Sequence, residues 1–255
     1  MAEKKPFNVF DIWEELGTTE HMGGIRATKR LIELCKITAG QYIMDIGCGT
    51  GYTACLLAKE YDVAVVAADI SPRVLEWAKK RIVEEGVADR VKAVEADAEK
   101  MSFPAGTFDV VIAESVLVHC DPKKAASEVY RVLKHGGLFG NSDVTYLKPP
   151  APELVALLSS SLIGRNIGAL QEHEWQALFR EAGFADISST VHKINLFDQF
   201  LNHLQVDGVR KYFSSLSRGL LDPKIRGPFF KREVLRAWRE YLSYVGYGLY
   251  VCRKD

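Results

Sequence analysis

The chain has 255 residues, of which 47% are apolar, and carries 33 basic and 33 acidic side chains, so its formal net charge is zero. This length is sufficient for one large α/β domain with a full hydrophobic core. The balanced charge provides no overall field that would attract nucleic acid, and we therefore expect no nucleic-acid partner.

The five cysteines are scattered along the chain and show no C-x-x-C spacing. This pattern indicates reduced thiols and not a disulfide set or a zinc site, so no metal is expected. The opening segment, Met1 to Pro6, is charged and is not followed by the apolar core of a signal peptide. No apolar run approaches the roughly 20 residues that span a bilayer. The sequence therefore predicts a cytoplasmic protein.

Two amphipathic helices are predicted at the start of the chain, over residues 7–16 and 25–37. They are separated by the segment His21-Met-Gly-Gly24, in which two glycines break the helical pattern. Neither helix belongs to a minimal nucleotide-binding unit.

A strand, a glycine turn and a helix follow each other from residue 42. Residues 42–46 form an apolar run interrupted only by Asp45, and the turn contains Gly47, Gly49 and Gly51. This order is typical of a nucleotide-type site, because residues without side chains let the backbone approach a ligand and a helix start presents unpaired N–H groups. The spacing differs from the G-x-G-x-x-G of dinucleotide sites, which disfavours NAD or FAD. A tight turn without a ligand is the alternative.

Strands then alternate with helices. Further strands are predicted at residues 63–68, 91–95, 108–113, 138–144, 187–194 and 247–252. A turn at Gly136-Gly137 is predicted to lead into the strand at residues 138–144. Ser71-Pro72 and Asp121-Pro122 mark two helix starts, because each places a capping side chain before a proline. This alternation predicts an α/β, Rossmann-like fold with a doubly wound, mostly parallel sheet of seven strands. Ligands bind such sheets outside the carboxyl ends of the strands, where Asp69, Asp97 and Glu114 all fall.

The predicted elements are consistent with a single domain over residues 1–255, with its binding core at residues 41–145. Residues 146–170 contain an apolar helix, and residues 196–245 are helical and aromatic with glycine and proline breaks. We interpret these two segments as helical insertions on the substrate side of the sheet.

The string Asp45-Ile-Gly-Cys-Gly-Thr-Gly51 closely resembles the first motif of class I S-adenosylmethionine (SAM)-dependent methyltransferases. In that family the glycine turn packs against the methionine half of the cofactor, and the acidic residue helps to orient its ammonium group. The resemblance implies that Asp45, Gly47, Cys48, Gly49 and Gly51 bind the cofactor. It is greatest to the group that includes the ubiquinone, menaquinone, tocopherol and sterol methyltransferases.

Asp69 lies 22 residues after Gly47, the usual separation between a glycine turn and the acidic residue that binds ribose hydroxyls. A carboxylate suits a vicinal diol because its two oxygens accept both hydroxyl protons. The alternative is a solvated aspartate in a turn. Ile70 would then lie against the adenine, or else belong to the core. Asp97 and Ala98 resemble the family's adenine-recognition motif, in which the aspartate accepts from the amino group and the next N–H donates to the ring.

The segment from Phe108 to His119 resembles the fourth motif of the family. Members present a residue near Glu114 or Ser115 to the methionine end of the cofactor. Some members that act on small molecules keep a histidine in the place of His119, where it removes a proton from the acceptor, a role suited to a pKa near neutrality. The alternative is a histidine that braces the loop before Asp121.

The resemblance also gives the segments before the first strand a role, because added N-terminal helices commonly cover the site in methyltransferases. We interpret residues 1–40 as part of such a lid. Gly24 would let the lid backbone meet the carboxylate of SAM, and His21 and Trp13 would face the methyl acceptor. The plain alternatives are a linker between two helices for His21 and Gly24, and a core position for Trp13.

Together these residues predict a SAM-dependent methyltransferase that acts on a small, lipophilic or anionic acceptor and releases S-adenosylhomocysteine (SAH). The basic balance of residues 224–239 suits an anionic acceptor or a membrane surface, although such charges are more often a solvated helix face. A methyltransferase for RNA or protein, and a SAM-binding protein without catalytic activity, are the alternatives.

Overall fold

The computed structural model describes residues 17, 21–160, 168–195, 202, 206, 217 and 232–255. The helix predicted over residues 7–16, which includes Trp13, lies outside these residues, as does most of the predicted insertion at 196–245. Within the described residues, no helix combines the length and the apolar character needed to cross a membrane.

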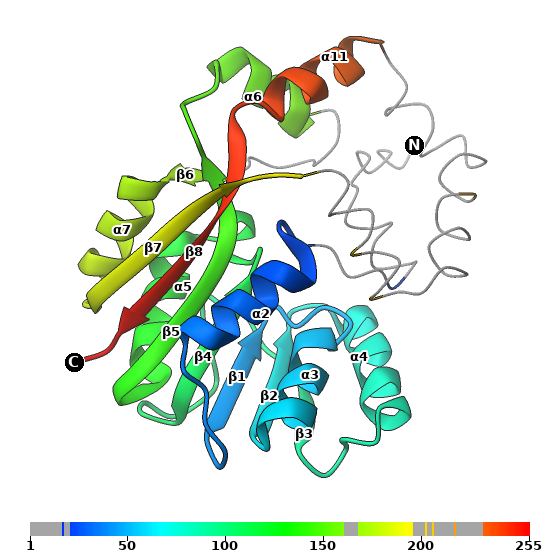
Figure 1. Ribbon diagram of the computed structural model, residues 1–255, viewed down its shortest axis with the longest axis vertical. Coiled ribbons are helices and arrows are strands. Elements are labelled where there is room, and N and C mark those ends of the chain that lie inside the picture. Colours follow the sequence, from blue (N-terminus) through cyan, green and yellow to red (C-terminus); the bar gives the residue numbers. More distant parts are fainter. Residues whose placement is uncertain are drawn as a thin grey trace, which may run out of the picture.

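A single sheet runs through the molecule (Figure 1). Its strands are β1 (Tyr42–Ile46), β2 (Ala64–Asp69), β3 (Val91–Glu95), β4 (Phe108–Glu114), β5 (Leu133–Tyr146), β6 (Leu170–Gln171), β7 (Ala185–Lys193) and β8 (Val245–Arg253). Seven of them form the continuous order β3-β2-β1-β4-β5-β8-β7, and the two-residue β6 pairs with β5 as an eighth. Strand β8 is antiparallel to both of its neighbours, β5 and β7, and the other pairs among these strands are parallel. The predicted mostly parallel, doubly wound sheet is confirmed, with one short strand more than expected.

The start of β5 differs from the prediction. The sequence predicts a glycine turn and then a strand from Leu138, whereas β5 begins at Leu133. Leu133 already pairs with Phe108, and the register then shifts before Val110 pairs with Leu138. Gly136, with a φ of 76°, lies within this irregular stretch. The predicted turn is therefore an irregularity inside a longer strand.

The helices cover both faces of the sheet. They are α2 (Gly24–Leu34), α3 (Tyr52–Tyr61), α4 (Pro72–Glu84), the short 3₁₀ helix η1 (Leu117–His119), α5 (Pro122–Val132), α6 (Pro152–Leu158), α7 (Glu172–Glu181) and α11 (Arg232–Tyr241). The two predicted helix starts are confirmed. The Ser71 hydroxyl accepts from the N–H of Val74 at 3.3 Å, and Asp121 accepts from the N–H groups of Lys123 and Lys124.

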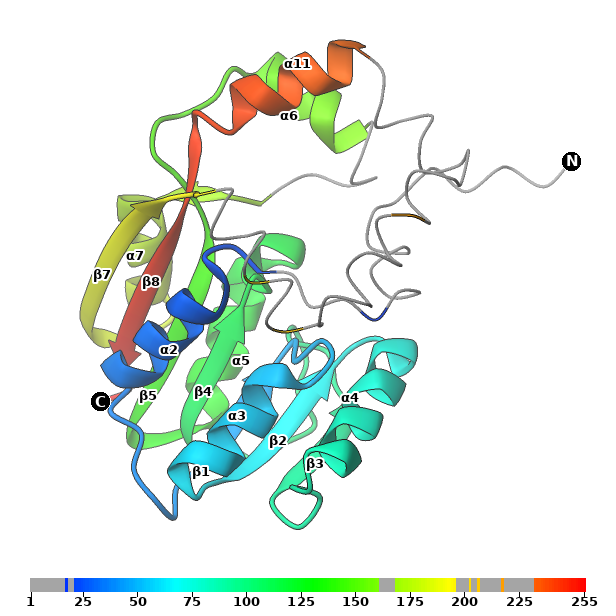
Figure 2. The same ribbon diagram turned by 45° about the vertical axis from the view of Figure 1, so that its right-hand side comes forward.

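Two large cores separate these layers. Helices α2, α3 and α4 bury one set of apolar side chains against one face, and α5 and α7 bury another against the opposite face (Figure 2). Strand β1 occupies the centre, with β2 on one side and β4 on the other. Because the chain proceeds from β1 to β2 in one direction and later to β4 in the other, the strand order reverses at β1.

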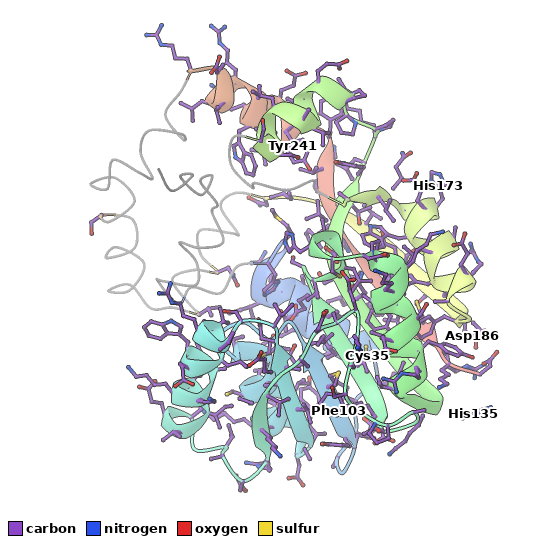
Figure 3. The ribbon with its side chains drawn as sticks, turned by 180° about the vertical axis from the view of Figure 1, so that it is seen from behind. Cys35, Phe103, His135, His173, Asp186 and Tyr241 are labelled. Atoms are coloured by element: carbon purple, nitrogen blue, oxygen red, sulfur yellow. The ribbon has the colours of Figure 1, made fainter. Side chains whose placement is uncertain are left out.

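A third, smaller core joins α6 to α11 beyond the end of β5. Tyr241 on α11 is buried in it and lies at one extremity of the molecule (Figure 3). The helical character predicted near residues 154 and 241 is confirmed. Whether these helices enclose an acceptor stays a prediction.

Candidate functional site

A cavity of about 510 Å³ opens at the carboxyl ends of β1, β2 and β4, where the strand order reverses. Most of the residues predicted to form a site line it: His21, Asp45, Gly47, Cys48, Gly49, Asp69, Ile70, Asp97, Ala98, Glu114, Ser115 and His119. Gly24 and Gly51 are not among the lining residues, and Trp13 lies outside the described residues. Residues predicted from five separate stretches of sequence thus meet around one cavity.

The glycine turn after β1 is held close to its neighbours. Gly47 has a φ of 69°, and a Cβ at this position would overlap the side chain of Val116. The N–H of Cys48 donates to the carbonyl of Ala68 at 2.9 Å, which ties the turn to β2. Gly51 precedes α3 with a φ of 77°, and a Cβ there would approach Ala78 of α4 at 3.2 Å. Gly51 therefore permits helix packing rather than lining the cavity.

Asp69 connects this turn to the start of α4. Its Oδ2 accepts from the N–H of Gly49 at 3.0 Å, and its Oδ1 accepts from the N–H of Ser71 at 3.0 Å. Each carboxylate oxygen can accept a further hydrogen bond from a ligand. The adjacent Ile70 is 64% exposed and lines the cavity, so its side chain does not belong to the core.

Asp97 and Ala98 follow β3 at another wall of the cavity. Asp97 Oδ1 accepts from the N–H of Glu99 at 2.8 Å, which fixes the loop, and Ala98 is buried. Glu99 also lines the cavity, so this wall combines a small apolar residue with two carboxylates.

Asp45 is a buried carboxylate whose Oδ2 has no hydrogen-bond partner among the described residues. Burial raises its pKa well above the ordinary value, and the nearby negative charges of Glu114 and Asp69 raise it further. Because an unsatisfied buried carboxylate oxygen is costly, its presence on a cavity wall indicates a site for a hydrogen-bond donor or cation. The ammonium group of SAM has the chemistry that this position requires.

Glu114, at the end of β4, is held by two threonines that the sequence analysis did not identify. The hydroxyl of Thr28 on α2 donates to Oε2 at 2.7 Å, and the hydroxyl of Thr53 on α3 donates to Oε1 at 2.7 Å. His21 Nδ1 lies 3.5 Å from the same Oε2, and His21 Nε2 lies 3.3 Å from the Thr28 hydroxyl. A threonine on the otherwise apolar inner face of a helix was the only sequence signal for Thr28.

His119 ends the short helix η1, which a second unpredicted residue supports. Asp143, fully buried on β5, accepts through Oδ2 from the N–H groups of Leu117 and Val118 at 2.9 and 3.3 Å. Burial raises the pKa of Asp143 to about 7. The sequence signal for Asp143 was the presence of an acidic residue within the strand predicted at residues 138–144. His21 and His119 both line the cavity. In the sequence, His21 precedes Glu114 and His119 follows it.

The described residues include no group of three or more His, Cys, Asp or Glu side chains that could hold a metal ion. All five cysteines are free thiols, as predicted. Two of them, Cys48 and Cys120, line the cavity, and burial raises the pKa of both, that of Cys120 to about 12.

Comparisons with known proteins agree with this site. A family model described as a methyltransferase domain matches residues 44–140, which contain the glycine turn and its partners. The uncharacterized methyltransferase YodH of Bacillus subtilis is 35% identical over 165 residues, covering 64% of this chain and 68% of YodH. The 27-O-demethylrifamycin SV methyltransferase of Amycolatopsis mediterranei is 33% identical over 173 residues. That match covers 67% of this chain and 64% of the relative.

Among solved structures, a SAM-dependent methyltransferase from Thiobacillus denitrificans in complex with SAH superimposes with a TM-score of 0.71 at 20% identity. The superposition covers 97% of this chain and 98% of that one, and it shows a shared fold. These two relatives are matched over about two thirds of their length, whereas phosphoethanolamine N-methyltransferase 3 of Arabidopsis thaliana is matched over 43% of its length. With the motif, the fold and these relatives in agreement, the chain belongs to the class I SAM-dependent methyltransferases.

Proposed function

We propose that this chain transfers the methyl group of SAM to a small molecule, with the cofactor in the cavity beyond β1, β2 and β4. The observation that carries the proposal is the buried Asp45 with its unsatisfied Oδ2 on the cavity wall. In this arrangement Asp45 and Glu114 receive the ammonium end of the cofactor, and Asp69 receives the ribose hydroxyls. Asp97 and Ala98 receive the adenine, against which Ile70 packs.

The charge of the wall supports a cationic ligand. Its described residues include the five carboxylates of Asp45, Asp69, Asp97, Glu99 and Glu114, and no Lys or Arg. SAM carries a sulfonium and an ammonium, so this wall attracts it by simple Coulomb forces. The same wall favours a neutral or cationic acceptor over an anionic one near the methyl group.

The chemistry requires mainly positioning, because a sulfonium methyl group is already activated. The acceptor atom attacks the methyl carbon from about 3 Å, in line with the departing sulfur. The bond from carbon to sulfur breaks, SAH leaves as a neutral thioether, and the acceptor loses its proton if it carries one. We assign His119 as the base for that proton, because it lines the cavity on the loop after β4.

A small-molecule acceptor is the class that the relatives favour, since one of them is named as a methyltransferase for 27-O-demethylrifamycin SV. Three exposed arginines lie on α11, namely Arg232, Arg236 and Arg239. Their positive charges would favour contact with an anionic membrane surface, which we propose as a secondary interaction. No described residue suggests a nucleic-acid channel.

The test is a methyl-transfer assay with SAM labelled on its methyl group and fractionated metabolite extract. The proposal predicts that label moves into a small organic molecule and that SAH accumulates in equal amount. Transfer only to RNA or protein, with no small labelled product, would replace the proposed acceptor class. Binding of SAM without transfer to any fraction would instead indicate a protein that binds the cofactor without catalysis.

A further inference from the structure

The carboxylate of Glu114 is a meeting point for three separate parts of the chain. Thr28 reaches it from α2, Thr53 from α3, and His21 from the residues before α2. The Glu114 side chain is only 7% exposed, and no Lys or Arg of the described residues forms an ion pair with it within 4 Å. Among the described residues, the Glu114 carboxylate is therefore held by two hydroxyl donors, with the His21 ring beside it, and not by a lysine or an arginine.

Hydrogen-bond geometry fixes the direction of these interactions. The Thr28 hydroxyl has one proton, and its 2.7 Å contact with Glu114 Oε2 is shorter than its 3.4 Å contact with the carbonyl of Gly24. With that proton given to Glu114, the Thr28 oxygen accepts from His21 in the ring form that carries a proton on Nε2. The result is a chain from His21 through Thr28 to Glu114, which sets the orientation of the carboxylate on that side.

Thr53 fixes the other side. Its hydroxyl donates to Oε1 at 2.7 Å, so both carboxylate oxygens are held and the carboxylate plane cannot rotate freely. Hydrogen bonds to charged acceptors are about twice as strong as those between neutral groups. Each oxygen still has acceptor capacity toward the cavity that Glu114 lines.

We propose that Thr28 and Thr53 are positioning residues, which orient the Glu114 carboxylate to receive the α-ammonium group of the cofactor. This inference rests on the proposed function, because it requires that SAM and SAH bind in the cavity. It adds that binding of the amino-acid half depends on how α2 packs against the sheet. Glu114 and the buried Asp45 then present two carboxylates to one ammonium group, which relieves their mutual repulsion.

The two threonines differ in a way that makes the test sharp. Thr53 lines the cavity and could touch a ligand itself, whereas Thr28 is not among the lining residues. An effect of Thr28 on ligand binding must therefore pass through the cavity residues that it contacts, Glu114 and His21. Valine has the shape of threonine without the hydroxyl, so Thr28→Val and Thr53→Val remove the hydrogen bond to Glu114 and keep the packing, and Thr28→Val also removes the contact with His21. Thr28→Ser keeps it.

A matched control lies at the opposite end of the same strand. Thr107 precedes β4, and its hydroxyl donates to the carbonyl of Pro104 at 2.7 Å, away from the cavity. Thr107→Val therefore removes a comparable hydrogen bond without altering Glu114. Thermal unfolding and circular dichroism of each variant report whether it folds, and Thr53→Val keeps the proposal testable if Thr28→Val does not.

The measurement is calorimetric affinity for two ligands, SAH and 5′-methylthioadenosine, which has the same adenosine but no amino-acid portion. We expect Thr28→Val and Thr53→Val to weaken SAH binding by roughly tenfold or more, as for loss of hydrogen bonds to a charged group. Affinity for 5′-methylthioadenosine should stay close to that of the wild type. Thr28→Ser should restore SAH binding, and Thr107→Val should not change it.

The outcomes separate the inference from the proposed function. If the wild-type chain binds no SAH, the proposed function fails. If the wild type binds SAH and the folded valine variants bind it equally well, the positioning role is wrong. Equal losses for both ligands, or no restoration by Thr28→Ser, would also overturn it, since the effect would then be a general disturbance of the cavity.

Discussion

The carboxylate of Asp69 accepts a hydrogen bond from the backbone N–H of Gly49 at 3.0 Å, so the end of β2 is tied directly to the glycine turn after β1. The other oxygen holds the N–H of Ser71 at the start of α4. The Asp69 side chain thus shapes the turn and, in the proposed function, accepts hydrogen bonds from the ribose hydroxyls. Both roles depend on a carboxylate at this position.

Replacement of Asp69 tests the ribose contact. Asp69→Ala should weaken SAH binding by about 1–3 kcal/mol, because it removes hydrogen bonds to a charged acceptor. Asp69→Asn should weaken SAH binding less than Asp69→Ala does, because the amide oxygen of asparagine can still accept a hydrogen bond from one N–H group. Calorimetry measures both, with Asp89→Ala as the control, because Asp89 has a 75% exposed side chain away from the cavity. Unchanged SAH affinity in Asp69→Ala would remove Asp69 from the ribose site.

The glycine turn gives a prediction in which steric overlap and backbone strain can be separated. Gly47→Ala should abolish most SAH binding, because its Cβ meets Val116 and alanine disfavours a φ of 69°. Gly40→Ala has a similar positive φ of 81° but no heavy atom within 4 Å of the new Cβ. It should therefore cost only the ~1–2 kcal/mol of stability expected for left-handed backbone, with SAH binding preserved.

Unfolding free energies from urea titration, together with SAH calorimetry, distinguish the two glycine variants. In the double variant Gly47→Ala, Val116→Ala, the overlap is relieved and part of the SAH affinity should return. If Gly47→Ala bound SAH as the wild type does, the close approach of the turn to its ligand would be excluded.

Local features of the sequence predicted local features of the structure well. Ser71 and Asp121 cap helices because the capping side chain and its N–H partners lie within three residues of each other. The strand at residues 42–46 was evident because its apolar pattern is intrinsic to it. The carboxyl ends of three strands were predicted to meet, because parallel sheets bring those ends together.

The features that escaped prediction are contacts between distant parts of the chain. Thr28 and Glu114 are separated by 86 residues, and Leu117 and Asp143 by 26. No periodicity or spacing records which helix face will meet which strand end. Gly24 illustrates the same limit: a Cβ there would meet Asn202, whose Oδ1 accepts from the N–H of Ile25, and these two residues are separated by 177 positions.

Replacement of His119 tests the proposed base. His119→Ala should slow turnover of the acceptor found in the labelling assay at least tenfold, in line with loss of general base catalysis, while SAH affinity stays close to that of the wild type. His135→Ala is the control, because His135 is exposed near the start of β5 and is not among the residues that line the cavity (Figure 3). Near-normal turnover of His119→Ala would assign His119 a bracing role.

The pKa of Asp143 predicts how stability changes with pH. Because burial raises this pKa to about 7, the folded state holds a proton on Asp143 at pH values where the unfolded chain has lost it. The stabilisation is complete below the ordinary pKa of an aspartate and is lost as the pH rises toward 7. The contribution of Asp143 to the free energy of unfolding should therefore fall between about pH 4 and about pH 7.

Asp143→Asn cannot titrate, so its free energy of unfolding should fall less than that of the wild type over the same range. Cys120 and Tyr250 are the titratable groups whose pKa Asp143 raises, and both ionise above this range. Urea unfolding at several pH values provides the comparison. Parallel pH profiles for the two proteins would show that Asp143 has an ordinary pKa in the folded state.

The account as a whole depends on the cavity at the ends of β1, β2 and β4 being a cofactor site. Isothermal titration calorimetry of the purified chain with SAM and with SAH tests this most directly. We predict saturable one-site binding of both compounds, weakened for SAH in Asp69→Ala. Absence of heat with either compound, from protein shown to be folded, would contradict the account.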